Sequence, residues 1–140
     1  AATGTIIDAE TSVALFGNIF FNKAPLHDGA SIIRDGKLFA AGCILPLTTN
    51  QNVDINLGTR HRAGLGISEQ SDAVVLIVSE ETGVISLAVN GILLREFTRE
   101  ALIKKLEQFL IYDRCYDDEE QSRKFFHKNP KSSNREKDDE

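Results

Sequence analysis

Three short clusters of polar and glycine residues interrupt apolar segments and carry most of the side chains that could do chemistry. The first is Pro25-Leu26-His27-Asp28-Gly29-Ala30, which stands directly before an apolar run. A glycine beside a carboxylate lets a ligand approach the backbone closely, so Asp28 could hold a divalent cation or accept a proton. An ordinary Asp-Gly turn is the competing interpretation of this cluster.

The second cluster, Gly58-Thr59-Arg60-His61-Arg62, predicts the beginning of a short helix with three cation-capable side chains in its first turn. Free backbone N–H groups and the helix dipole favour an anion at such a position, whereas arginine is poorly placed there unless a negative ligand is bound. Arginine also pairs well with phosphate oxygens. A solvated basic surface patch is the alternative. The nearby Gly64-Leu65-Gly66 does not complete a dinucleotide-binding or P-loop motif.

The third cluster, Ser79-Glu80-Glu81-Thr82-Gly83, follows the most apolar run of the chain, Ala73–Val78. Ligands often bind at the carboxyl end of a strand, although an acidic turn between two strands would look the same. Together, a carboxylate beside glycine, a cationic helix start and an acidic turn suit phosphoryl or nucleotidyl transfer, in which positioning and charge neutralisation by a metal dominate.

Composition narrows the class of protein. The chain has 140 residues, 16 Lys+Arg and 21 Asp+Glu, which give a formal net charge of −5. This size predicts one globular domain, and the acidic balance argues against broad binding of nucleic acid. Cys43 and Cys115 are interpreted as reduced thiols, because they have neither CxxC spacing nor enough partners for a disulfide framework. No run of residues has the length and apolarity of a membrane span or a secretory signal.

Periodicity and turn signals predict a mixed α/β domain over residues 1–112. We expect a helix near residues 13–20 with Asp8 as its N-cap, and a later helix capped by Thr98 whose apolar stripe reaches Leu110. The expected strands are Ala30–Ile33, Leu38–Leu45, Ala73–Val78, Val84–Val89 and Ile92–Leu94, with a hairpin turn at Asp35-Gly36. The unbroken Ala73–Val78 run predicts a strand that is buried on both faces.

Residues 113–140 differ in character from the rest of the chain. They carry nine acidic and seven basic residues among 28, and few apolar groups. A segment of this composition buries too little surface to offset its ordering entropy. We therefore predict a charged, mostly disordered C-terminal tail.

The order and spacing of the three clusters resemble the diadenylate cyclase domain (DAC, or DisA_N) family, nearest its membrane-anchored type. The resemblance covers about Gly4 to Leu110, and flanking segments share it: Pro25-Leu26-His27, Leu45-Pro46-Leu47, Gly66-Ile67-Ser68-Glu69 and Asn90-Gly91. It implies the DAC-domain fold, a mixed central β-sheet flanked by helices. In the family a helix and the first strands precede the segment equivalent to Gly4, and we expect this sequence to lack them, which would leave part of the sheet without a neighbour.

The resemblance also implies an activity, the condensation of two ATP into cyclic di-AMP and two pyrophosphates across a face-to-face homodimer. Family enzymes use Mg²⁺, Mn²⁺ or Co²⁺. The alternative is a folded module that binds ATP or cyclic di-AMP but is inactive because of truncation or a wrong dimer. A third hypothesis is a purely structural interaction domain. It is disfavoured because the polar residues of all three clusters are present.

Family roles transfer to individual positions of this chain. Asp28 would bind the metal and help to activate the 3′-hydroxyl group, with His27 and Glu81 as further candidate ligands. Arg60, His61 and Arg62 would complete the catalytic set. The implied ATP-binding residues are Gly29, Ala30, Leu45, Gly58, Thr59, Arg60, His61, Arg62, Ser79, Glu80 and Glu81.

The resemblance finally suggests partners and a location. ATP would be the substrate, cyclic di-AMP the product and a second copy of the chain the catalytic partner, with no role for nucleic acid. A YbbR-type regulator and phosphoglucosamine mutase are expected as possible partner proteins. The full-length protein would act at the cytoplasmic face of the cell membrane, and this chain by itself would be soluble.

Overall fold

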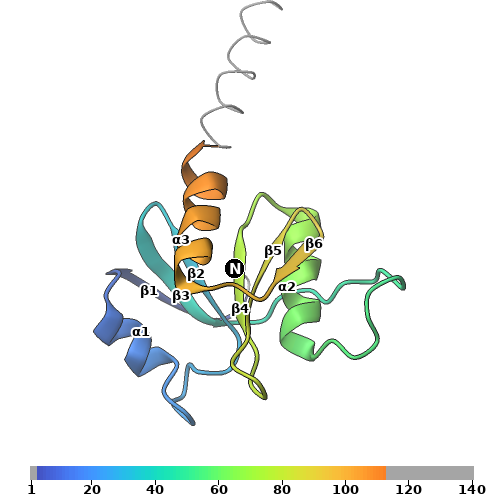
Figure 1. Ribbon diagram of the computed structural model, residues 1–140. Helices are drawn as coiled ribbons and strands as arrows, with labels where there is room; N and C mark the ends of the chain where they lie inside the picture. The colour runs from blue at the N-terminus through green and yellow to red at the C-terminus, as the bar shows by residue number, and fades with distance from the viewer. Residues whose placement is uncertain (1–2, 113–140) are drawn as a thin grey trace, which may run out of the picture. The chain divides into compact units, whose positions relative to one another are not determined.

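The structure is a computed structural model that describes residues 3–112. Its contacts divide the chain into two units, Ala1–Leu94 and Arg95–Glu140. The predicted tail, residues 113–140, lies outside the described residues. The mixed α/β class is confirmed, and the six strands of the described part are distributed over two three-stranded sheets (Figure 1).

The first sheet contains β1 (Thr5–Glu10), β2 (Ala30–Arg34) and β3 (Lys37–Cys43) in the order β1-β3-β2, and both pairings are antiparallel. Helix α1 (Val13–Ile19) lies between β1 and β2 in the chain. Its apolar residues pack with β1 and β3 around one core cluster, whose buried members are Ile19, Leu38 and Ala41. This packing fixes the loop that carries the first polar cluster, because Leu26 contacts the same core.

The start of the chain differs from the prediction. Strand β1 was not predicted, and the assignment of Asp8 as a helix N-cap is wrong, since Asp8 lies inside β1 with φ 47° where the register with β3 shifts. Ser12 caps α1 instead, and its hydroxyl oxygen accepts the Leu15 N–H at 3.1 Å. Residues 5–10 form a strand because they pair with β3, whose residues are more than 25 positions away in the chain. Local capping preferences do not reveal such a long-range pairing.

The hairpin between β2 and β3 confirms its sequence signal. Asp35 and Gly36 both have positive φ, 52° and 74°, as a two-residue turn with this twist requires. Strand β3 then ends at Cys43, where Gly42 also has positive φ, 66°.

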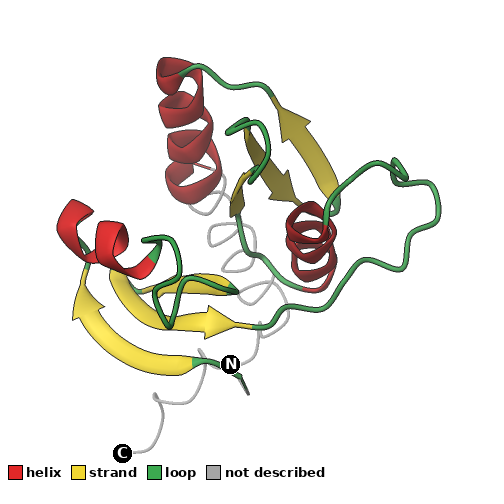
Figure 2. Cartoon of the chain, turned by 90° about the horizontal axis from the view of Figure 1, so that it is seen from below, coloured by secondary structure: helices red, strands yellow, loops and turns green. Residues whose placement is uncertain are grey.

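The second sheet contains β4 (Val75–Val78), β5 (Ile85–Val89) and β6 (Ile92–Arg95) in the order β4-β5-β6. Helix α2 (Thr59–Gln70) packs against β4 and β5, and Figures 1 and 2 both draw it beside this sheet. The buried centre of this packing consists of Leu65, Ile77 and Ala88. Helix α2 is longer than the short helix that we expected, because it continues through Gly64-Leu65-Gly66 to Gln70.

The expectation that residues 73–78 form a strand buried on both faces is wrong. Strand β4 is at the edge of its sheet, and the side chains of Leu76 and Val78 remain 45% and 43% exposed, whereas Ile77 is buried. An apolar run cannot by itself distinguish an edge strand from a central one, because the distinction depends on how many neighbours the strand acquires.

The glycines of α2 serve helix packing. A Cβ atom on Gly64 would lie 2.5 Å from Ile77 Cδ1 of β4, and one on Gly66 would overlap the Pro46 carbonyl oxygen. Residues two apart point to nearly opposite sides of a helix, so these glycines allow close approach on two different faces. This explains Gly64-Leu65-Gly66 without a phosphate-binding role.

The second unit contains α3 (Arg99–Glu107), followed by a π-helical turn at Gln108–Tyr112. Thr98 caps α3 as predicted, and its hydroxyl oxygen accepts the Ala101 N–H at 3.2 Å. Lys104 and Lys105 stand in the last turn of α3, where the negative end of the helix dipole stabilises positively charged side chains. Among residues 3–112, no helix has the length and apolarity needed to cross a membrane.

Candidate functional site

The second and third polar clusters meet in the folded chain. Arg60 Nη2 and Glu80 Oε1 are 2.5 Å apart, and Arg60 Nη1 donates to the Val78 carbonyl oxygen at 3.4 Å. The guanidinium group at the start of α2 is therefore held at the carboxyl end of β4. Both side chains remain partly exposed, 45% for Arg60 and 65% for Glu80, so a ligand can still reach them.

The first turn of α2 combines donors with positive charge. Gly58 is the N-cap residue, no side chain caps the helix, and the first turn contains no acidic residue. Thr59 is exposed, and Arg62 lies one turn into the helix with its Nε donating to the Leu57 carbonyl oxygen at 3.2 Å. Backbone N–H groups and arginine side chains at a helix N-terminus form an environment that an anion stabilises.

The acidic turn after β4 is ordered by its own residues. The Ser79 N–H donates to Val84, the Gly83 N–H donates to Ser79, and both N···O distances are 3.0 Å. The Ser79 hydroxyl oxygen also accepts the Thr82 N–H at 3.3 Å. Glu81 is exposed, whereas Glu80 reaches Arg60. This turn therefore sets the position of the carboxylate that pairs with the helix start.

The first cluster places its carboxylate in solvent. The Asp28 side chain is 89% exposed, and its Oδ1 lies 3.5 Å from Nε2 of the half-buried His27. Gly29 has φ 96°, and a Cβ atom there would lie 2.8 Å from the Cys43 carbonyl oxygen and from the Gly42 carbonyl carbon. Only glycine fits this close approach to the end of β3, and the backbone of Gly29 thereby fixes where Asp28 projects.

His61 points into the protein rather than to solvent. It is 6% exposed, and its Nε2 lies 3.4 Å from the hydroxyl oxygen of Ser86, a fully buried residue of β5. The position makes His61 part of the packing beneath the helix start. Sequence reasoning missed Ser86, although a serine between Ile85 and Leu87 in an apolar strand was a usable signal.

The remaining predicted residues lie at the ends of the strands of the first sheet. Ala30 opens β2 opposite Cys43, and the half-buried Leu45 follows the end of β3. In the described part of the chain, Arg60 pairs with Glu80 and His27 pairs with Asp28, and no ion pair connects these two pairs of residues.

The residues near Asp28 fit only a particular kind of metal site. Among residues 3–112, no group of three or more histidine, cysteine or carboxylate side chains lies together. The exposed Asp28 carboxylate fits a cation such as Mg²⁺, which usually takes one or two protein carboxylates and completes its shell with water and substrate phosphates, whereas an imidazole ligand suits a transition-metal ion better.

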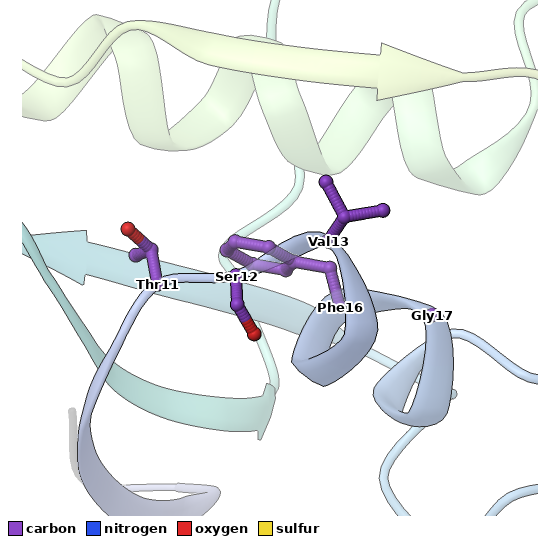
Figure 3. A pocket seen from close by; sticks show the side chains of 5 residues that line it. All are labelled: Thr11, Ser12, Val13, Phe16 and Gly17. Carbon is purple, nitrogen blue, oxygen red and sulfur yellow. The ribbon is translucent and has the colours of Figure 1, made fainter.

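A shallow depression of about 600 Å³ lies elsewhere, at the start of α1 (Figure 3). Its lining residues are Thr11, Ser12, Val13, Phe16 and Gly17. They contribute no ionisable side chain, and none of them belongs to the three polar clusters. This depression is therefore a poor candidate for binding a charged ligand.

The amino-acid sequence is similar to those of several known proteins. The chain is 50% identical to the cyclic di-AMP synthase CdaA of Bacillus subtilis over 105 residues, which are 75% of this chain and 38% of that protein. It is 57% identical to the cyclic di-AMP synthase CdaS of the same organism over 90 residues, 64% of this chain and 43% of that protein. A diadenylate cyclase of Listeria monocytogenes is 46% identical over 109 residues, 78% of this chain and 40% of that protein.

Solved structures agree with these similarities. The crystal structure of a double mutant of DacA from Staphylococcus aureus matches with a TM-score of 0.75 and 44% identity over 79% of this chain and 73% of that one. A hypothetical membrane spanning protein from Bacillus cereus matches with a TM-score of 0.67 and 49% identity, over 69% of this chain and 47% of that one.

The chain spans only about two fifths of the length of the curated relatives it matches, between 38% and 43% for the three proteins compared. The matched residues nevertheless include all three polar clusters, because the family pattern described as "DisA bacterial checkpoint controller nucleotide-binding" covers residues 1–93. This chain therefore belongs to the DisA-type nucleotide-binding family, known by its domain name DAC.

Proposed function

We propose that this chain is the nucleotide-binding and catalytic part of a diadenylate cyclase, which converts two ATP into cyclic di-AMP and two pyrophosphates. The observation that carries the proposal is the start of α2, where uncapped backbone N–H groups, Arg60 and Arg62 stand together without an acidic residue in the first helical turn. An ATP triphosphate would bring to this helix start the negative charge that its first turn does not contain, in addition to the Glu80 carboxylate that pairs with Arg60. The names of the relatives support the same substrate and product.

The reaction needs few chemical groups from the protein. The 3′-hydroxyl oxygen of one ATP forms a bond to the α-phosphorus of the other, the bond from that phosphorus to the β-phosphate bridging oxygen breaks, and pyrophosphate leaves with the electron pair. The hydroxyl proton passes to a base or to solvent. A second, reciprocal step closes the ring. In this scheme Asp28 accepts or polarises the 3′-hydroxyl proton, and its exposed carboxylate is free to approach a nucleotide.

We assign binding roles to the residues of the three clusters as part of this proposal. Thr59, Arg60 and Arg62 hold the phosphates, while Glu80 keeps the Arg60 guanidinium at the edge of β4. The buried His61 side chain packs between the helix start and β5, next to Ser86, and thereby orients the first turn of α2. Gly29, Ala30 and Leu45 border the sugar and base. Glu81, whose side chain is exposed, would complete the phosphate and metal environment.

A divalent cation completes this proposal. Asp28 would hold it, with His27 or Glu81 as a further ligand, and the cation would neutralise phosphate charge as Mg²⁺, Mn²⁺ or Co²⁺ does in phosphoryl transfer. Two nucleotides must also face each other, because each supplies the nucleophile for the other. We therefore propose a symmetric homodimer as the catalytic unit.

Incubation of the chain with ATP and Mn²⁺, followed by chromatography of the nucleotides, tests the proposal directly. We expect cyclic di-AMP and pyrophosphate, with a rate per protomer that rises with protein concentration as the dimer forms. ATP-dependent thermal stabilisation without product at any concentration, in Mg²⁺, Mn²⁺ or Co²⁺, would contradict the cyclase and support the alternative of an inactive binding module. No response to ATP at all would contradict both.

Replacement of Arg60 by alanine tests the phosphate site. We expect the dissociation constant for ATP to rise about tenfold to a hundredfold, because a charge-assisted contact with phosphate is lost, as measured by titration calorimetry. Arg34→Ala is the matched control, since Arg34 is also an exposed arginine beside a carboxylate, that of Asp35. Equal ATP affinity of the Arg60 and Arg34 variants would place the triphosphate elsewhere.

The cellular setting is a further proposal. The similarity to CdaA and to a protein described as membrane spanning supports a full-length protein that works at the cytoplasmic face of a membrane. A YbbR-type regulator and phosphoglucosamine mutase remain predicted partners on the basis of family resemblance. Co-purification of the full-length protein with each candidate checks both.

A further inference from the structure

The connection between β3 and α2 crosses the helix before it reaches the helix start. Figure 1 shows this connection as a long loop that passes α2 and then turns back to the start of the helix. Its residues Pro46–Thr48 lie against Gly66, where a Cβ atom would overlap the Pro46 carbonyl oxygen and come within 2.7 Å of the Thr48 nitrogen. We call these three residues the strap. Backbone packs directly on backbone here, which leaves little freedom for sliding.

Two hydrogen bonds fix the strap along the helix axis. The Thr48 N–H donates to the Arg62 carbonyl oxygen at 2.9 Å, and the Thr48 hydroxyl donates to Glu69 Oε1 at 2.6 Å. Arg62, Gly66 and Glu69 are spaced by four and three residues, so they share one face of α2. Thr48 is 8% exposed, and its hydroxyl oxygen also accepts the Asn50 N–H at 3.2 Å.

The same end of α2 is fixed from a second side. The Ser68 hydroxyl donates to the Leu65 carbonyl oxygen at 2.9 Å and accepts the Gly91 N–H from the β5–β6 turn at 3.1 Å. Glu69 also lies beside this turn, because a Cβ atom on Gly91 would be 3.0 Å from Glu69 Cγ. Glu69 is thus bonded to the strap and adjacent to the β5–β6 turn.

The strap joins two parts of the proposed nucleotide site. Leu45, assigned to the base, is three residues before Thr48 in the chain, and Arg62, assigned to the phosphates, accepts the Thr48 N–H through its own carbonyl group. A shift of the strap along α2 would therefore change the separation between the base and phosphate positions. An α-helix is stiff over this length, so a contact near its end controls the placement of its first turn.

We propose that Thr48 and Glu69 are positioning residues, which set the distance between the adenine and triphosphate subsites by locking the strap to α2. The inference rests on the proposed function and assigns roles to two residues outside the polar clusters. Neither side chain is placed in contact with the nucleotide, so their effect passes through Leu45 and Arg62.

The test compares ATP with ligands that occupy one subsite only. Thr48→Val keeps the side-chain shape and removes the hydroxyl group, and we expect its dissociation constant for ATP to rise about tenfold. The dissociation constants for tripolyphosphate and for adenosine should stay within about twofold of the parent, because each ligand needs only one subsite. Thr48→Ser should restore ATP binding, and Thr49→Val, at the exposed neighbouring threonine, serves as the matched control.

Glu69 provides an independent arm if Thr48→Val does not fold. Glu69→Gln keeps an oxygen that accepts the Thr48 hydroxyl and should bind ATP normally, whereas Glu69→Leu should show the same selective loss of ATP. Uniform weakening of ATP, tripolyphosphate and adenosine, or unchanged ATP binding in both Thr48→Val and Glu69→Leu, would overturn the inference. Failure of the parent chain to bind ATP would instead refute the proposed function.

Discussion

Replacement of Asp28 by asparagine is expected to reduce the rate of cyclic di-AMP formation at least about a hundredfold, the usual scale for removal of a general base or a metal-binding carboxylate. Asparagine has nearly the same size but carries no negative charge and cannot accept the 3′-hydroxyl proton. The measurement is the initial rate of product formation at saturating ATP and Mn²⁺, with the ATP dissociation constant determined in parallel.

Stability should not change in this variant, because the Asp28 side chain is 89% exposed and its ion-pair partner within the described residues is the neighbouring His27. Asp35→Asn is the matched control, since Asp35 is 93% exposed and stands in the β2–β3 turn, away from the polar clusters. We expect full activity from this control. Turnover by Asp28→Asn at the rate of the Asp35 control would remove Asp28 from the reaction and leave the Arg60–Glu80 pair as the catalytic candidate.

Replacement of Gly29 by alanine is expected to lower the free energy of unfolding by about 2–4 kcal/mol, because two costs add. The first is the positive φ of 96°, and the second is the approach of the new methyl group to within 2.8 Å of the backbone of Gly42 and Cys43. The methyl group cannot be accommodated by a side-chain rotation, because its neighbours are backbone atoms. Thermal and urea unfolding of the purified chain measure the effect.

Gly36→Ala separates the two costs. Gly36 also has positive φ, 74°, but nothing lies within 4 Å of a Cβ atom there, so the change should cost only the roughly 1–2 kcal/mol of backbone strain. The folded fraction of Gly29→Ala should also form cyclic di-AMP slowly. The added methyl group would push the backbone that carries Asp28 away from the end of β3 and so displace the Asp28 carboxylate. Equal destabilisation by the two substitutions would mean that the contact between Gly29 and β3 contributes nothing.

Local signals predicted much of the fold because each depends on a few neighbouring residues. The Asp35-Gly36 turn, the Thr98 cap and the strands after residue 30 follow from turn chemistry, capping and alternation. Strand β1 and the exposure of β4 did not follow, since both depend on which strand pairs with which. An apolar run such as Ala73–Val78 contains no information about its missing neighbour.

For the candidate site, too, the sequence predicted some features and the tertiary structure decided others. By itself the sequence determined which side chains could carry the chemistry, because Asp28, Arg60 and Glu80 stand in short polar clusters whose types and spacing resemble one family. Only the tertiary structure decided that Arg60 pairs with Glu80, that His61 lies buried beside Ser86, and that Thr48 bonds to Glu69. Each of these contacts joins residues 20 to 25 positions apart, and such contacts form when helix α2 packs on its sheet and its strap, which is a property of the whole unit and not of any local pattern.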